Sequence, residues 1–139
     1  MTGTKHKLGE ASDVEVRDLI ARTLVGESAQ AAGLEAASPH GEGLGGRLLV
    51  FGVGEDPGEP VRGRWVHVGY RGYGDSTDSP LPALKPGELL ALHEGAGAQP
   101  EAVFLLTAED LTRMPGSPVA VREEWRATGE RWRACVLGG

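Results

Sequence analysis

The sequence predicts a single α+β domain. We expect a mostly antiparallel sheet of about five strands, an N-terminal helix packed on one face, and a C-terminal β-hairpin. Three observations support this. The 139 residues include 22 glycines and 9 prolines, which favour short strands joined by tight turns. A capped apolar pattern with helical spacing lies near the N-terminus, and apolar and polar residues alternate at the C-terminus.

The N-terminal part is predicted to be helical after a flexible arm. Residues 1–11 are polar and form the arm, and residues 12–139 form the domain. Ser12 and Glu15 have the spacing of a capping box, which marks a helix start. Gly26 is expected to end this helix, and a second short helix is expected over 28–37. The stripe expected to face the sheet consists of Val16, Leu19, Ile20, Thr23 and Leu24.

Four further segments are predicted to be strands. Residues 47–53 have the apolar run of a central strand buried on both faces. Residues 61–71 alternate, and residues 89–93 and 101–106 are short apolar runs bounded by turn residues. A turn is expected over 85–88, and Thr107 has the position of an N-cap before a short helix. In the 61–71 strand, one face is expected to carry Val66, Val68 and Tyr70, and the other Trp65 and His67.

The C-terminal residues predict a hairpin with one buried face. Apolar residues alternate with charged ones on both sides of a turn at 128–130. Trp125 and Trp132 both fall on the apolar side of this alternation. We therefore expect both tryptophans in the core.

Composition argues against several partner classes. The chain carries 14 basic and 20 acidic residues, a formal charge of -6, which disfavours nucleic acid. No apolar run approaches the ~20 residues that span a bilayer, so no membrane association is expected. Cys135 is the only cysteine and the start of the chain lacks a signal-type apolar core, which favours a cytoplasmic location. Arginine in excess of lysine suggests a bacterial coding bias.

No metal or cofactor is predicted. The four histidines have no ligand spacing, and Cys135 has no CxxC partner. His93 and Glu94 are expected at the surface. The glycine-rich segment 41–46 lacks the Lys-Ser/Thr pair of a phosphate-binding loop.

The 67–79 segment is the first candidate ligand site, because its glycines let backbone amides approach a ligand. Residues 70–76 resemble the strand-to-loop segment of α/β-hydrolases, and His40-Gly41 is similar to that family's oxyanion loop. The resemblance implies a serine hydrolase, but the chain has no G-x-S-x-G motif, so no catalytic residue is assigned. The candidate ligand-binding residues are His67, Tyr70, Arg71, Tyr73, Asp75 and Ser76.

Two shorter resemblances concern single residues. Residues 21–28 resemble the helix end that carries the catalytic glutamate of some bacterial cell-wall hydrolases, which implies a role for Glu27; the family's downstream Asn-Arg pair is missing. Gly138-Gly139 resembles the tail of ubiquitin-like and sulfur-carrier proteins, which implies chemistry at the terminal carboxylate. Those folds begin with a hairpin, whereas a helix is expected here.

The wet face of the predicted hairpin is the second candidate surface. Guanidinium groups there could bind a protein partner or a small anionic ligand. The alternatives are a solvated face with Arg–Glu pairs, and cover by another copy in a homo-oligomer. The candidate residues are Arg122, Arg126, Arg131 and Arg133.

The sequence therefore favours a non-catalytic binding or regulatory domain that acts through protein or small-ligand contacts. A small enzyme that uses the 67–79 segment is the first alternative. A carrier that uses its glycine tail is the second.

Overall fold

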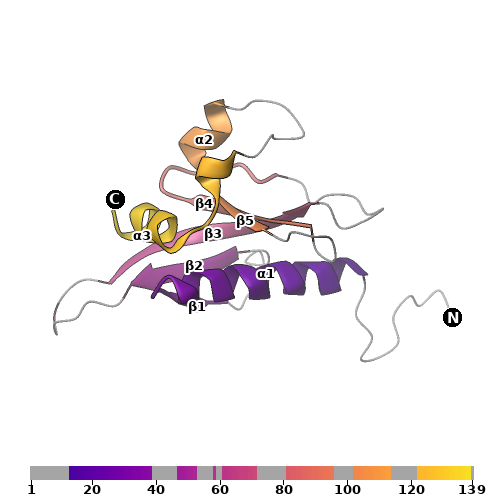
Figure 1. The fold of residues 1–139 in the computed structure, drawn as a ribbon, viewed down its shortest axis with the longest axis horizontal. Coiled ribbons are helices and arrows are strands. Elements are labelled where there is room, and N and C mark those ends of the chain that lie inside the picture. The colour runs from indigo at the N-terminus through magenta and orange to yellow at the C-terminus, as the bar shows by residue number, and fades with distance from the viewer. Residues whose placement is uncertain are drawn as a thin grey trace, which may run out of the picture.

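The computed structural model describes residues 13–38, 47–52, 58, 61–71, 81–95, 102–113 and 122–138. Within these ranges the chain forms helices and one sheet (Figure 1). In chain order the elements are α1 (Asp13–Ala31), β1 (Glu35–Ala37), β2 (Arg47–Gly52), β3 (Arg62–Arg71), β4 (Leu89–Glu94), β5 (Ala102–Thr107), α2 (Ala108–Arg113), the 3₁₀ helix η1 (Glu123–Trp125) and α3 (Gly129–Leu137).

The sheet has five strands in the order β1-β2-β3-β4-β5, which confirms the α+β class and the expected strand number. It is mixed, however, and not mostly antiparallel as predicted. Strands β3 and β4 pair in parallel, from Val66 beside Leu89 to Arg71 beside Glu94, while the other neighbours are antiparallel. A parallel pair needs a connection that returns to the starting end of the sheet. The connection lies between Arg71 and Leu89 and includes the turn predicted at 85–88.

Helix α1 is longer than predicted and continues past Gly26 to Ala31. It ends at Gly33, which has a φ of 85°. The amide of Leu34 donates to the carbonyl of Ala29 (3.1 Å), and the amide of Gly33 donates to the carbonyl of Gln30 (2.9 Å). This pattern is a Schellman motif, which needs a left-handed residue at the position of Gly33. The short helix predicted over 28–37 is therefore wrong, since 28–31 belong to α1 and 35–37 form β1.

The side of α1 that packs on the sheet is not the predicted one. The helix contacts all five strands. Its buried side carries Ala21, Val25 and Ala29, which let the helix lie close to the sheet, and Ala32 is buried just beyond its end. Val16, Leu19 and Ile20 face outward and are 43%, 59% and 40% exposed. Ser12 of the predicted capping box lies outside the described residues.

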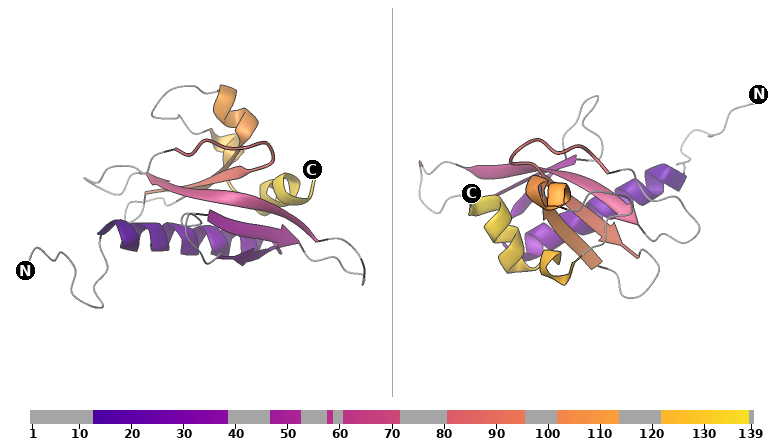
Figure 2. Two further views of the ribbon diagram at one scale, coloured as in Figure 1. Left: turned by 180° about the vertical axis from the view of Figure 1, so that it is seen from behind. Right: turned by 90° about the horizontal axis from the view of Figure 1, so that it is seen from above.

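Two apolar clusters lie on the two faces of the sheet. The larger joins α1 and α3 to one face and includes Val50, Val66, Leu105 and Trp132. The smaller joins η1 to the other face at β4 and β5, and is formed by Leu90, Phe104, Leu106 and Trp125. Figures 1 and 2 show α1 along one side of the sheet and α2 on the opposite side.

The strand buried on both faces is β4, not the 47–53 segment. Five of the six residues of β4 are buried, and it lies between β3 and β5. Strand β2 alternates instead, with Leu48 and Val50 buried and its other four residues partly exposed. The cause is its position, since only the short β1 lies beyond it. The alternation predicted for β3 is confirmed, because Val66 and Val68 join the larger cluster.

The C-terminus is helical, so the predicted hairpin is wrong. Thr128 caps α3, its hydroxyl accepting from the amide of Arg131 at 3.1 Å. Trp125 and Trp132 are buried as expected, but they lie in clusters on opposite faces of the sheet. The period-of-two pattern failed here because Trp132 and Val136 are also four residues apart, which is helical spacing. Residues 119–121 lie outside the described part.

Candidate functional site

A cleft of about 720 Å³ opens at the end of the sheet where β4 begins. We call it the Arg64 cleft. Its walls come from β3, the turn before β4, α2 and α3. The lining residues are Arg64, Leu84, Pro86, Gly87, Glu88, Leu89, Thr107, Ala108, Glu109, Thr112, Arg131, Ala134 and Cys135.

The cleft exists because β3 extends beyond β4. Val66 pairs with Leu89, the first residue of β4, so residues 62–65 have no β4 neighbour. Arg64 stands on this extension. The turn of residues 85–88, predicted from the sequence, forms the facing wall, with the amide of Glu88 donating to the carbonyl of Lys85 at 3.0 Å. Gly87 has a φ of 87° there, as a type II turn requires, and a Cβ at this position would lie 3.1 Å from Nη1 of Arg64.

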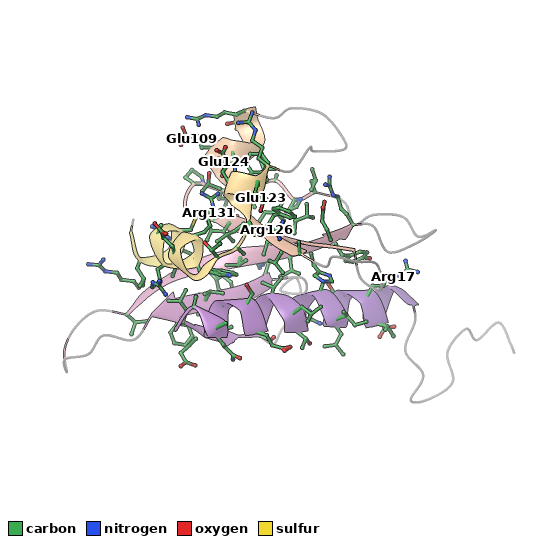
Figure 3. The ribbon with its side chains drawn as sticks, viewed as in Figure 1. Arg17, Glu109, Glu123, Glu124, Arg126 and Arg131 are labelled. Carbon is green, nitrogen blue, oxygen red and sulfur yellow. The ribbon has the colours of Figure 1, made fainter. Side chains whose placement is uncertain are left out.

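Arg131 forms a second wall, but its guanidinium is already hydrogen-bonded within the fold. Its guanidinium donates to the carbonyl of Leu105 through Nε (3.1 Å) and Nη2 (2.6 Å), and Nη2 also donates to Asp110 Oδ2 (3.0 Å). These bonds hold α3 against β5 and α2, and Figure 3 shows Arg131 between the two helices. Burial would raise the pKa of Asp110, but hydrogen bonds from Thr107 and Arg131 outweigh it and lower that pKa below its usual value.

The acids of the cleft also have partners. Glu88 Oε1 lies 3.0 Å from His67 Nε2 and accepts from the amide of Lys85 at 2.9 Å. The backbone bond from Lys85 is the main cause that lowers the pKa of Glu88; burial opposes it, and His67 adds to it. Glu109 accepts from Arg113, four residues on.

Arg64 differs from these residues, because it has no hydrogen bond or ion pair with any residue in the described ranges. It lies on the same face of β3 as Val66, so its side chain shares the α3 side of the sheet. It is partly exposed and lines the cleft. This guanidinium is therefore the cation that the cleft can offer to a ligand.

Cys135 lines the cleft from α3 and is partly buried. Burial raises the pKa of its thiol above the ordinary value. Arg131 and Arg64 lower it and Asp110 raises it, each to a smaller degree than burial. A thiol with a raised pKa reacts more slowly at neutral pH than an ordinary cysteine.

The residues predicted around the 67–79 segment are not all on one side. His67 and Arg71 lie on the same face of β3, whereas Tyr70 lies on the opposite face and is buried. Arg71 donates through Nε to Glu94 Oε2 at 2.7 Å. Of these residues the structure thus brings His67 and Arg71 to one face, each beside an acid. Tyr73, Asp75 and Ser76 lie outside the described residues.

Each of the four predicted arginines makes local contacts within the described residues. Arg122 pairs with Glu124 and lies over the ring of Trp125, and Arg126 pairs with Glu123 and lies over that of Phe104. The pairing raises the pKa of Arg126 and lowers that of Glu123. Arg131 binds inside the fold, and Arg133 Nη1 donates to the carbonyl of Ala32 at 3.0 Å.

The structure also locates His93, Glu27 and Gly138, which the sequence had singled out. His93 is buried, so its expected surface position is wrong. In the described part of the chain no group of three or more metal-ligating side chains occurs. Glu27 is exposed inside α1 and not at a helix end. Gly138 is the C-cap of α3, whereas a strand was expected before it. Gly139 lies outside the described residues.

Sequence reasoning missed Arg64. No motif in the surrounding sequence marks Arg64 as a binding residue. The cleft that it lines forms only because β3 and β4 pair in parallel, which the sequence did not predict. A second hollow of about 380 Å³ is lined by Leu49, Phe51, Val61, Gly63 and Trp65 and has no charged lining residue. The Arg64 cleft is therefore the better-equipped ligand site of the described regions.

No family model, curated protein or solved structure matches the chain. No helix in the described ranges is long and apolar enough to cross a membrane.

Proposed function

We propose that this protein is a small-ligand-binding domain and that the Arg64 cleft takes a singly charged anion with an apolar body. The observation that carries the proposal is the position of Arg64. It is a guanidinium without a partner among the described residues, in a cleft whose acids and second arginine are paired elsewhere.

Guanidinium geometry favours a carboxylate or sulfonate, which accept two parallel hydrogen bonds. One uncommitted cation neutralises one negative charge. A doubly charged phosphate would leave one charge uncompensated beside Glu88 and Glu109. The cleft thus suits a monoanion.

The remaining walls supply apolar contact. Leu84, Pro86, Leu89 and Ala134 line the cleft with little hydrogen-bonding capacity. An alkyl or aryl body would bury surface against them, at about 0.8 kcal/mol for each methylene removed from water. A ligand of this class needs both parts, because one surface-exposed charge pair gives little affinity.

The test compares three probes with the same alkyl chain: octanoate, octanol and octylamine. Cys135 is the only cysteine and lines the cleft, so the rate of its alkylation reports occupancy. Octanoate should slow alkylation at lower concentration than octanol, and octylamine should have the weakest effect. Isothermal titration calorimetry gives the affinities independently.

The matched variants are Arg64→Gln and Arg47→Gln. Arg47 lies on the other face of the sheet, over the ring of Trp65, and does not line the cleft. Arg64→Gln should weaken octanoate binding by roughly tenfold, as expected for a lost charged hydrogen bond, and leave octanol unchanged. Equal binding of octanoate and octanol, or an Arg64→Gln variant that binds octanoate like the original chain, would refute the proposal.

A further inference from the structure

The turn that faces Arg64 accepts few residue types at its third position. Pro86 and Gly87 are its central residues, the pair that a type II turn favours, and Gly87 has a φ of 87°. Glycine, and less often asparagine or aspartate, adopts such a φ. The turn is also closed by two bonds, from the amide of Glu88 to the carbonyl of Lys85 (3.0 Å) and from the amide of Lys85 to Glu88 Oε1 (2.9 Å). Its shape is therefore fixed, and position 87 is restricted.

The end of the Arg64 side chain lies against this turn at Gly87. A Cβ at position 87 would lie 3.1 Å from Nη1 of Arg64, which is closer than most real Cβ contacts. Arg64 stands on the part of β3 that extends beyond β4, so no β4 residue lies beside it. The guanidinium thus occupies the place that a side chain at position 87 would enter.

The acid next to Gly87 is held away from Arg64. Glu88 Oε1 lies 3.0 Å from His67 Nε2. His67 and Arg64 are three residues apart on β3, so they stand on opposite faces of the sheet. Position 87 is therefore the place in the turn from which an acid could neutralise Arg64, and glycine there supplies none.

We propose that Gly87 is the positioning residue of the Arg64 cleft and determines the charge of its ligand. The inference rests on the proposed function of the cleft. Glycine lets the guanidinium of Arg64 lie against the turn and leaves it without an acid of the chain, so the ligand supplies the carboxylate. Aspartate at this position would suit the turn and would place a carboxylate beside Arg64. The same fold would then lose its preference for anions.

The first experiment needs no ligand. Gly87→Asp is made in the original chain and in an Arg64→Gln chain, and NMR follows the titration of the introduced carboxyl group in both. Beside Arg64 the pKa of this group should lie about one unit lower than in the Arg64→Gln chain, because an opposite charge at contact distance favours the ionised form. The same pKa in both chains would overturn the inference.

The second experiment measures the binding of octanoate and octanol by isothermal titration calorimetry. Gly87→Asp should weaken octanoate binding by at least roughly tenfold, as expected when Arg64 is neutralised, and should change octanol binding much less. Gly87→Asn adds nearly the same volume without a charge and should weaken octanoate binding less than Gly87→Asp does. Equal losses from the two changes would mean that added volume alone disturbs the site, and would contradict the role in charge selection.

Gly33→Asp is the matched control. Gly33 has nearly the same φ, 85°, and no atom lies within 4 Å of a Cβ built there. It does not line the cleft, so the backbone cost is similar while Arg64 is left alone. Gly33→Asp should therefore keep the ratio of octanoate to octanol affinity, and circular dichroism checks that both aspartate variants fold. A ratio that falls equally in the two variants would assign the loss to backbone strain and count against the inference.

The two experiments separate this inference from the proposed function. An original chain that binds octanoate no better than octanol refutes the proposed function, while a lowered pKa in the first experiment still supports the position of Gly87 against Arg64. A preference for octanoate that survives Gly87→Asp supports the proposed function and overturns the inference.

Discussion

The indole Nε1 of Trp132 donates a hydrogen bond of 2.8 Å to the hydroxyl of Ser28. This bond joins α3 to α1 inside the larger cluster, where the Trp132 side chain is fully buried. The Ser28 hydroxyl lies 3.5 Å from the carbonyl of Ala127, just before the start of α3. Because α3 also carries Arg131 and Cys135, this joint fixes one wall of the Arg64 cleft.

Ser28→Ala should therefore destabilise the fold. The change leaves a buried indole N–H without an acceptor, at about 1–3 kcal/mol. Urea denaturation followed by tryptophan fluorescence measures the free energy of unfolding. Ser38→Ala is the control, because Ser38 is exposed after β1. A Ser28→Ala variant within about 0.5 kcal/mol of the original chain would show that this bond contributes nothing.

Two glycines near the end of α1 should respond to alanine with opposite sign. Gly33 has a φ of 85°, a conformation in which alanine is strained, so Gly33→Ala should destabilise by about 1 kcal/mol. Gly26 lies inside the helix, and a Cβ there would meet the Cβ of Ala36 at an ordinary 3.9 Å. Gly26→Ala should therefore stabilise by about 0.5–1 kcal/mol. Thermal unfolding of the two variants compares them, and the same sign for both would contradict this assignment of the helix end.

Local patterns in the sequence predicted most of the strands, because alternation and turn residues determine them directly. The turn at 85–88, the N-cap at Thr107 and the two faces of β3 are confirmed. The errors occurred where one pattern fits two structures. Helix α1 has apolar residues on both sides, and packing selected the alanine side. The apolar residues around Trp132 fit both the two-residue period of a strand and the four-residue spacing of a helix. The segment forms a helix, α3, which is capped at both ends.

The candidate site was harder to predict, because it depends on pairing between distant segments. Arg64 and Cys135 are 71 positions apart in the sequence, and they meet at one cleft only since β4 starts beside Val66. Arginine is common in the chain, and nothing local separates Arg64 from Arg131. The partners separate them: Arg131 binds the Leu105 carbonyl, whereas Arg64 has no partner among the described residues.

Asp110 should make stability depend on acid pH. Its carboxylate accepts from the amide of Thr107 (2.9 Å) and from Arg131 (3.0 Å), and its pKa is lowered in the folded chain. At pH values between the lowered pKa and the usual value of about 3.9, the unfolded chain binds more protons, so stability rises with pH. The contribution is complete above the usual value and is lost as pH falls through the lowered one.

Asp110→Asn removes this charge and should flatten the acid limb of stability against pH. It should also destabilise at neutral pH by about 1.5–3 kcal/mol, since Arg131 loses a charged acceptor. Denaturant midpoints measured from neutral pH downward give both quantities. Glu35→Gln is the control, as Glu35 is exposed on β1. An Asp110→Asn variant with the original acid limb would assign that limb to other carboxyl groups.

The Cys135 thiol should deprotonate at a higher pH than an ordinary cysteine, and Arg64 should affect its pKa. Burial raises its pKa, so alkylation should be slow at neutral pH and should accelerate at a higher pH than for an ordinary cysteine. Arg64 lowers this pKa in part, so Arg64→Gln should shift the pH–rate profile further upward. Arg47→Gln lies on the other face of the sheet and should leave the profile in place. The rate of iodoacetamide modification measured against pH checks both statements. A profile with the midpoint of a free thiol would mean that Cys135 is more solvated than its place in the cleft wall implies, and an unchanged Arg64→Gln profile would separate Arg64 from the thiol.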